Sequence, residues 1–397
     1  MVERFRYTEE VGGSNPSRAY HDPLTKTDSG SHSLAAPPGR LVSLDFFRGC
    51  VMFLLIGEAT GLYDLLLDPR LAGTFVGAVG RALQHQPWNG LRLWDLGLPF
   101  FLLISGVALA VSSAKRSKDG RGGGLGRILR RSLLLLLLGW ALYLVSPVES
   151  NPRGAFLYDV LPHLAFGGLV AFLLLKRKPA AQLGVALGLL ALTEALYRLC
   201  PVPGYNQPFV PDHNFGSWVD RLLTGEISEG HWVAWNIVPS AAFVIWGTMA
   251  GRLLLNKTSV ARKIRTMVAA GLAALAAGLA LSAVTPIIRR ISTSSFVLVG
   301  GGLGLLALAL AYGLVDGLSL RKVPAFFAVV GANPLFIYLF TQSGGAEWFE
   351  RLAAPFAGAF TGWIGAWPAA VLTSLAVWGG LWFVCFWLYR RRILIRI

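Results

Sequence analysis

Apolar runs of about twenty residues recur from residue 44 almost to the C-terminus, and they constrain the fold more than any other feature of this sequence. A helix of about 20 mainly apolar residues spans the roughly 30 Å hydrocarbon core of a bilayer. Within that core, backbone polar groups must be satisfied inside the protein. The runs therefore predict an all-α, polytopic transmembrane helical bundle of about ten spans. The predicted spans are 44–66, 93–113, 132–147, 158–175, 179–198, 233–254, 267–285, 294–315, 325–343 and 367–389.

Composition supports the same class of protein. Of 397 residues, 54% are hydrophobic and 14% are charged, whereas soluble domains have about 45–50% and about 25%. Cys50, Cys200 and Cys385 lie far apart, which argues against a disulfide framework, a zinc site or a redox motif. The net charge of +15 comes from basic clusters between apolar runs, the pattern of a protein oriented in a lipid bilayer. We therefore expect no nucleic-acid partner.

Lys and Arg are distributed unevenly between alternate loops of this bundle. Most of the 36 basic residues fall on one side, in the N-terminal tail, at 115–131, 176–178 and 252–265, and at the C-terminus. Because basic loops stay in the cytoplasm, the pattern predicts two cytoplasmic termini and a multi-pass protein of the cell inner membrane. Residues 1–40 are polar and rich in Gly, Ser and Pro, which predicts a disordered cytoplasmic tail. The membrane domain is then 41–397.

The first predicted span carries charges at membrane depth. Asp45 and Arg48 are three residues apart on one helical face, near the cytoplasmic end. We expect either that they form a structural ion pair or that Arg48 binds an anionic group that arrives from the cytoplasm. Glu58 lies deeper, after FLLIG. A carboxylate there should face the protein interior, as a functional group or as a neutral side chain hydrogen-bonded to a neighbouring helix.

The segment before the second span, HQPWNGLRLWD, places a histidine near two polar partners. Asn89 and Asp95 follow His85 by four and ten residues, and Asp95 is placed to orient the imidazole and fix its tautomer. A single histidine near an interface can also be a solvated loop residue. His163 lies near the outer end of another span without such neighbours. No HxxxH-type spacing occurs, so no metal is expected.

Asn333 precedes Pro334 within the ninth predicted span, and Gly331 is nearby. This pattern predicts an uneven helix. Irregular backbone at membrane depth is tolerated where it lines a cavity rather than lipid. Asn333 is expected either to satisfy carbonyls freed by the kink or to line a ligand cavity.

Four segments carry a resemblance to a known family: RLVSLDFFRG, HQPWNGLRLWDLGLPFFLLISGVAL, TSSFVLVGGG and VGANPLFIYLFT. Together they resemble the heparan-alpha-glucosaminide N-acetyltransferase family, from residue 40 to the C-terminus. The resemblance implies a transmembrane acyltransferase domain at 41–397 that takes acetyl-CoA as co-substrate from the cytoplasm and an amino-sugar acceptor from the outer side. His85 stands at the position of the catalytic histidine. The likeness also implies a homodimer.

The same matching assigns further residues. Asp45, Arg48 and Asn333 fall on family motifs and are expected to bind acetyl-CoA. Asp95 is expected to assist His85, and Asn89 could donate to the developing oxyanion.

The acceptor site is expected to lie where the sequence departs from the family pattern, in IGEAT and LPHLAF. We assign Glu58 and His163 of these segments, together with Trp88, to sugar or glycan binding. Neutral imidazole can remove the amine proton or carry the acetyl group itself, and both routes stay open.

Two other functions fit the same residues. One is an ion-coupled secondary transporter, with Asp45, Glu58 and Asp95 as the ion path and His85 as a gate. The sequence has no obvious internal repeat, which many transporters show. The other is an O-acyltransferase that acts on hydroxyls of an envelope glycan. Acceptor profiling separates this last function from N-acetyl transfer.

Overall fold

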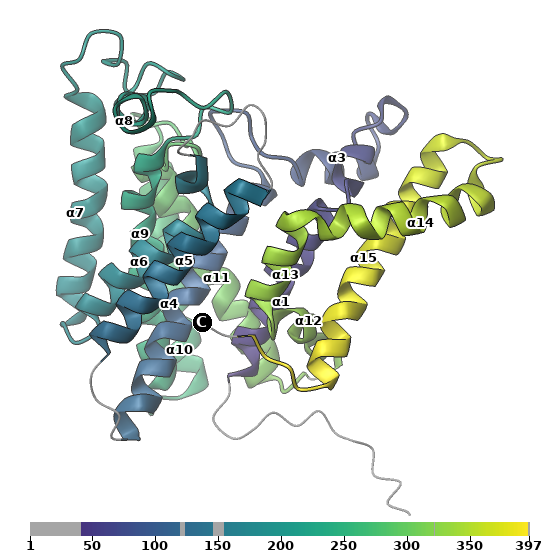
Figure 1. The fold of residues 1–397 in the computed structure, drawn as a ribbon. Helices are drawn as coiled ribbons and strands as arrows, with labels where there is room; N and C mark the ends of the chain where they lie inside the picture. The colour runs from purple at the N-terminus through teal and green to yellow at the C-terminus, as the bar shows by residue number, and fades with distance from the viewer. Residues whose placement is uncertain (1–40, 120–123, 146–154, 321, 396–397) are drawn as a thin grey trace, which may run out of the picture. The chain divides into compact units, whose positions relative to one another are not determined.

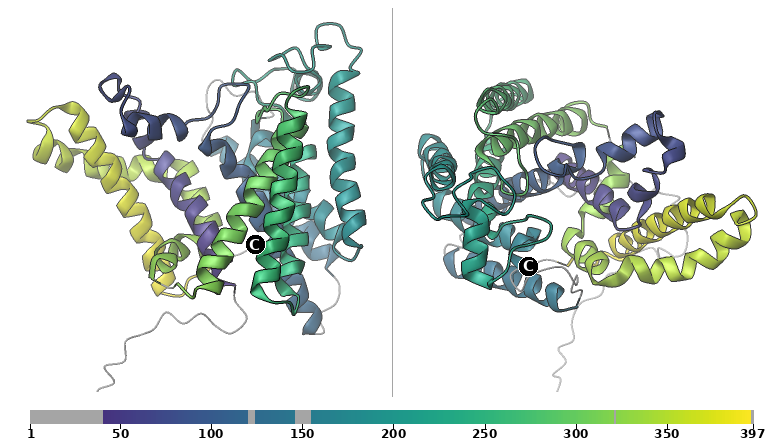
Figure 2. Two further views of the ribbon diagram at one scale, coloured as in Figure 1. Left: turned by 180° about the vertical axis from the view of Figure 1, so that it is seen from behind. Right: turned by 90° about the horizontal axis from the view of Figure 1, so that it is seen from above.

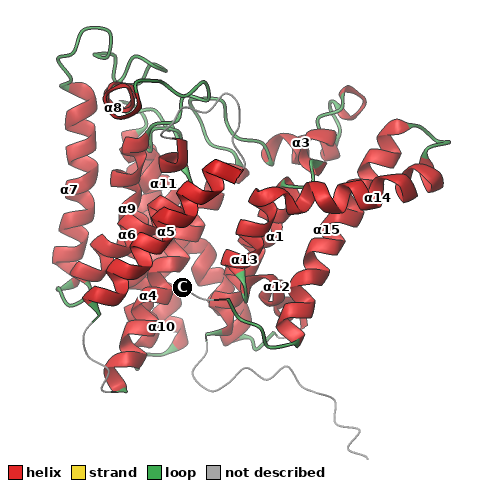
Figure 3. Ribbon diagram, viewed as in Figure 1, coloured by secondary structure: helices red, strands yellow, loops and turns green. Residues whose placement is uncertain are grey.

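The computed structural model describes residues 41–119, 124–145, 155–320 and 322–395. The predicted tail at 1–40, residues 120–123 of the basic stretch 115–131 and the last two residues of the predicted span 132–147 lie outside the described residues. Within these ranges the regular elements are helices (Figure 3), with one isolated antiparallel bridge between Asn89 and Ile288. The all-α prediction is confirmed for this part of the chain.

The long helices are α1 (Val42–Glu58), α4 (Gly97–Lys118), α5 (Leu125–Val145), α6 (Val160–Leu174), α7 (Pro179–Arg198), α9 (Ile237–Leu255), α10 (Val260–Leu281), α11 (Ser294–Tyr312) and α15 (Ala366–Arg390), labelled in Figure 1. The shorter ones are α2 (Leu62–Leu65), α3 (Phe75–Ala82), α8 (Phe215–Thr224), α12 (Lys322–Gly331), α13 (Pro334–Phe340) and α14 (Ala346–Thr361). The single-turn segments Leu93–Leu96 and Ala155–Tyr158 lead towards α4 and α6.

Seven helices in the described ranges are long and apolar enough to cross a membrane, or eight if a bent pair counts as one span. That pair joins 323–331 to 334–361 with a bend of 65°. It coincides with the ninth predicted span, so the expected break at Gly331 and Pro334 is present. Two other predicted spans fall on shorter helices, α1 with 17 residues and α6 with 15. The count of ten spans and the orientation of the termini stay predictions.

Close backbone contacts between helices hold the bundle together. Where α4 packs on α9, a Cβ atom at Gly106 would lie 2.1 Å from the Val244 carbonyl oxygen, and one at Gly247 would lie 2.0 Å from the Leu103 carbonyl oxygen. Small residues permit such contact, and dispersion then stabilises helix pairs that lipid would otherwise separate. Glycine at these positions is therefore required by the packing.

α1 lies between two groups of helices. It contacts α4 and α11 on one side and α12 and α15 on the other, as Figure 2 shows. Its contact with α12 is again backbone to backbone, because a Cβ at Gly49 would lie 2.0 Å from the Phe327 carbonyl oxygen and one at Gly331 2.3 Å from that of Asp45. α1 thus brings Asp45, Arg48 and Glu58 into the bundle at different depths.

Two loops meet at the end of the bundle where α4 and α11 begin. The backbone N–H of Gly90 donates to the Ile287 carbonyl at 2.8 Å, next to the bridge between Asn89 and Ile288. One loop carries His85, and the other carries Arg289 and Arg290. The pairing therefore brings these side chains together from positions two hundred residues apart in the sequence.

Replacing Gly49 by Ala is expected to lower the stability of the bundle. The added methyl group would meet a backbone carbonyl that cannot rotate away, and overpacking of this kind costs about 1–3 kcal/mol. Thermal unfolding in detergent, followed by tryptophan fluorescence, measures the change. Gly188→Ala in α7 is the matched control, since a Cβ atom there meets no atom within 4 Å beyond its chain neighbours and the backbone of its own helix. An unfolding midpoint for Gly49→Ala equal to that of the control would contradict this account of the packing.

Candidate active site

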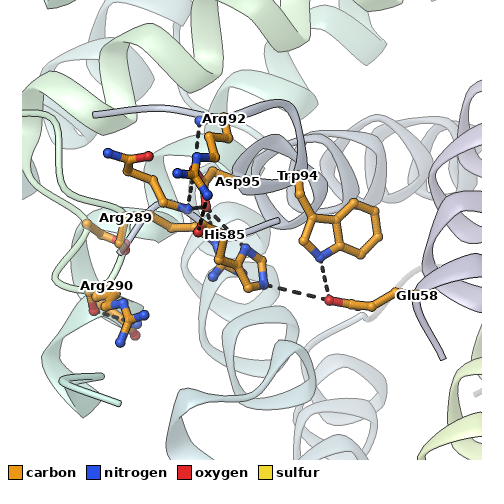
Figure 4. A network of polar contacts seen from close by, with 10 residues as sticks. Glu58, His85, Arg92, Trp94, Asp95, Arg289 and Arg290 are labelled. Carbon is orange, nitrogen blue, oxygen red and sulfur yellow. Dashed lines mark hydrogen bonds and ion pairs between the residues drawn. The ribbon is translucent and has the colours of Figure 1, made fainter. Parts of the chain in front are cut away.

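His85 is hydrogen-bonded to a buried carboxylate. Its Nδ1 lies 3.1 Å from Oδ1 of Asp95, whose side chain has no exposed surface. Asp95 also accepts hydrogen bonds from the backbone N–H groups of Arg92, at 2.8 Å, and Gln86, at 3.3 Å (Figure 4). Because these partners donate, the carboxylate is the acceptor, and we assign the proton of the neutral imidazole to Nδ1. Nε2 then keeps its lone pair.

The local sequence explains why the loop closes around Asp95. Asp95 is the last residue but one of the turn Leu93–Leu96, and its side chain caps the start of that turn at Arg92. The guanidinium of Arg92 reaches back to donate to the carbonyl oxygen of His85 at 3.2 Å. His85 is therefore held both at its ring and at its backbone.

Glu58 faces the other nitrogen of the imidazole from the end of α1. Its Oε1 accepts from the indole N–H of Trp94 at 2.5 Å and lies 3.9 Å from Nε2 of His85. The latter distance is too long for a direct hydrogen bond. The indole of Trp94 is stacked on the imidazole with centroids 6.2 Å apart. Glu58 thus lies beside the basic nitrogen without blocking it.

Two arginines bring positive charge to the same place. The Arg289 guanidinium lies 4.5 Å from the ring centre of Trp232, and Nε is 4.0 Å from Oδ1 of Asp95. Arg290 approaches the same indole at 5.2 Å. Nε and Nη1 of Arg289 are buried, with no hydrogen-bond partner among the described residues.

Burial and these charges set the protonation of His85. Burial lowers the pKa of the imidazole, the Asp95 hydrogen bond raises it, and the positive charges of Arg289 and Arg290 lower it again, leaving the pKa below the usual 6.5. Burial also lowers the pKa of Arg289 to about 10, so this side chain stays charged at neutral pH. His85 is therefore neutral at pH 7, as a general base must be.

His85, Glu58 and Arg289 line a cavity of about 370 Å³, hereafter the outer cavity. A second cavity of about 760 Å³, the inner cavity, lies deeper along α4. Basic side chains line the inner cavity: Arg48, Arg116, Arg127, Arg130 and Arg131. Asp45 lines it too and pairs with Arg48 at 3.6 Å, so the structural ion pair and the cavity location are both present.

The structure does not bring every predicted residue to a cavity. Asn89 is exposed and lines neither cavity, and its backbone takes part in the bridge to Ile288. Trp88 donates to the Phe209 carbonyl at 2.8 Å and packs on the ring of His231, again away from both cavities. The geometry therefore gives these two residues a part in holding the loop.

His163 and Asn333 are buried beside the cavities rather than facing them. Nδ1 of His163 donates to the backbone carbonyl of Asp159, an outer-cavity residue, at 2.6 Å. The Asn333 amide donates to the Ile393 carbonyl at 2.8 Å and accepts from the backbone N–H of Ile395 at 2.9 Å. Asn333 thus fixes the segment after α15, and Ile395 of that segment lines the inner cavity.

Three residues at the outer cavity escaped prediction. Arg289 and Trp232 lie in no quoted segment, and Tyr338 lies in VGANPLFIYLFT, where only Asn333 was assigned a role. The pair RR two residues before TSSFVLVGGG was the available hint, because two arginines there depart from the basic-inside pattern.

A half-buried histidine paired with a buried carboxylate beside a cavity, carried by a bundle of apolar helices, defines a multi-pass membrane protein equipped for acid–base chemistry. A family model described as "Heparan-alpha-glucosaminide N-acetyltransferase, catalytic" matches residues 40–283, more than half of the chain. The chain belongs to this family of membrane acetyltransferases, so the resemblance in the sequence is confirmed.

Two curated relatives carry the same name. The chain is 31% identical to heparan-alpha-glucosaminide N-acetyltransferase of Homo sapiens over 136 residues, which are 34% of this chain and 18% of that protein. It is 30% identical to the Mus musculus protein over 127 residues, 32% of this chain and 17% of that one. The aligned segment covers less than a fifth of either relative.

Replacing Arg289 by Gln is expected to raise the pKa of His85. Arg289 disfavours the imidazolium, so its loss makes protonation easier, while Asp95 still favours the charged ring. Histidine NMR titration measures the pKa, with His85→Ala identifying the signal. Arg221→Gln, an exposed change in α8, should leave the pKa where it was. A pKa that falls in Arg289→Gln, or does not move, would contradict the electrostatic account.

Proposed function

We propose that this protein is an integral membrane acetyltransferase that transfers an acetyl group from cytoplasmic acetyl-CoA to an amino-sugar acceptor on the outer side. The observation that carries the proposal is the pair of abutting cavities, one with His85 and Glu58 and the other lined by arginines. Family membership supports acetyl transfer as the reaction. We further propose ten spans, with both termini cytoplasmic in the inner membrane.

The inner cavity suits the phosphate groups of CoA. Five arginines line it, and guanidinium groups bind phosphate through paired, charge-assisted hydrogen bonds. Asp45 orients Arg48 among them. Asn333 contributes by fixing the segment that places Ile395 on the wall of the cavity.

His85 acts as the general base in the outer cavity. Nε2 removes a proton from the acceptor amine as the nitrogen attacks the thioester carbonyl carbon. The new C–N bond forms, the C–S bond breaks, and the proton passes from the imidazolium to the leaving thiolate. Asp95 holds Nδ1–H and stabilises the transient imidazolium. In the alternative route, Nε2 itself carries the acetyl group between thiol and amine.

Arg289 is better placed than Asn89 to stabilise the developing oxyanion. It lines the same cavity as His85 and has buried N–H groups without a partner among the described residues, whereas Asn89 is exposed. A preorganised positive donor in a water-poor site stabilises charge that appears only in the transition state.

The acceptor side of the outer cavity combines an acidic side chain with aromatic walls. Glu58 is 45% exposed and lies 3.9 Å from Nε2 of His85, so a protonated amine could pair with it before losing its proton. Trp94 and Trp232 contact the His85 ring and also line this cavity, which gives it aromatic walls suited to a sugar ring. We therefore assign Glu58 to acceptor binding.

Replacing His85 by Ala is expected to lower acetyl transfer by about 10²–10⁴-fold, the usual contribution of a general base. Purified protein in detergent, radiolabelled acetyl-CoA and a panel of amino sugars measure the transfer. Asp95→Asn should also lower it strongly, because an amide can donate to Nδ1 and move the ring proton to Nε2. Binding of acetyl-CoA should survive both changes. If the wild-type protein does not bind acetyl-CoA, acyl transfer is excluded and the charged residues belong to a transport path.

Replacing Arg131 by Gln tests donor binding. The loss of one charge-assisted phosphate contact, about 1.5–3 kcal/mol, should raise KM for acetyl-CoA about tenfold or more while kcat changes little. Acetyl-pantetheine lacks the nucleotide phosphates, so its KM should be the same in both proteins. An equal rise in KM for both donors would mean that Arg131 acts through the structure and not through phosphate.

A further inference from the structure

The outer and inner cavities share three lining residues. Phe101 comes from α4, Val160 from the start of α6 and Tyr338 from α13. The two cavities therefore abut at these side chains, which come from three separate helices. We call this set the neck.

Tyr338 is held in place by its hydroxyl group. The phenol O–H donates to the carboxylate of Asp159, which also accepts from the backbone N–H of Val160 at 2.5 Å. Only 6% of Tyr338 is exposed. Asp159 thus links Tyr338 to the start of α6, which carries the second neck residue, Val160. A ring fixed in this way gives the neck a defined width, since it cannot swing aside without breaking a buried hydrogen bond.

Reacting groups lie on both sides of the neck. His85 and Glu58 line the cavity above it, and the arginines line the cavity below. If the proposed function holds, an acyl donor with its phosphates among the arginines reaches His85 only through the neck. The acyl group passes first, and the thin pantetheine arm follows it.

We propose that the neck selects acyl groups by width, with Tyr338 as the specificity-determining residue. An unbranched acyl group is no wider than the arm that follows it, so it passes. A group branched next to the carbonyl must push Tyr338 or Phe101 aside. Packed interiors resist such displacement, so branched donors are excluded. This inference rests on the proposed function.

Butyryl-CoA and isobutyryl-CoA test the idea sharply, because they are isomers that differ in shape and not in atom count. The measured quantity is the ratio of kcat/KM for butyryl-CoA to that for isobutyryl-CoA. Tyr338→Ala and Phe101→Ala, which change neck residues from two different helices, should each lower the wild-type ratio about tenfold, a typical value for one methyl group in a fitted pocket. Any intrinsic difference in reactivity between the two thioesters is the same for every variant, so it cancels when the ratios of variant and wild-type protein are compared.

Tyr143→Ala is the matched control. Tyr143 lines the outer cavity but not the inner one, so the variant enlarges the acceptor side without touching the neck. Its ratio should stay at the wild-type value. A ratio that falls as far in Tyr143→Ala as in the neck variants, or that changes in neither neck variant, would overturn the proposal.

A second measurement tests the neck without any transfer reaction. Leu142 lines the outer cavity alone, so Leu142→Cys is a reporter above the neck. In sealed vesicles that expose the arginine-lined face, a membrane-impermeant thiol reagent should label it slowly, and several-fold faster in combination with Tyr338→Ala. The chain without the reporter gives the background from native cysteines. Equal labelling rates would overturn the neck, whereas absence of acetyl transfer in the wild-type protein would contradict only the proposed function.

Discussion

The buried carboxylate of Asp95 is the constraint on which the candidate active site depends. A carboxylate without exposed surface is costly unless several donors satisfy it. Its donors are the backbones of Gln86 and Arg92 and the imidazole of His85. The loop can meet this demand only by closing around Asp95, and closure fixes the tautomer and position of His85. A polar cluster before an apolar helix therefore gains a fixed base at the mouth of the bundle.

Close helix packing places this mouth above a second site. Glycines bring the backbones of α4 and α9, and those of α1 and α12, into direct contact. Larger side chains line the two cavities. The break before Pro334 turns α13 away from the line of α12, and Tyr338 on α13 reaches the junction of the two cavities. A residue of the broken span thus lies where the cavity with the histidine meets the cavity with the arginines.

Much of this arrangement could be predicted from the sequence, for identifiable reasons. Long apolar runs predict helices, and His85 and Asp95 lie ten residues apart in one loop, so their contact is local. The spacing of Asn89 from His85 says nothing about which way the side chain points in an irregular loop, and Asn89 lines neither cavity. Arg289 and Tyr338 could not be predicted, because their places depend on loop pairing and helix packing between segments about two hundred residues apart. Asn333 sits at the predicted break, but its partners, Ile393 and Ile395, come from the distant C-terminus.

In the proposed reaction, the charges around His85 serve two opposing needs. A base must keep its lone pair in the resting state, which Arg289 and Arg290 favour by disfavouring the imidazolium, together with burial. The same ring must become positive during transfer, and Asp95 on one nitrogen and Glu58 near the other then face it with negative charge. With the carboxylates alone, His85 would be protonated too readily. With burial and the arginines alone, it would be too weak a base. A site with both sets needs little reorganisation when the proton moves, because the compensating charges are already in place.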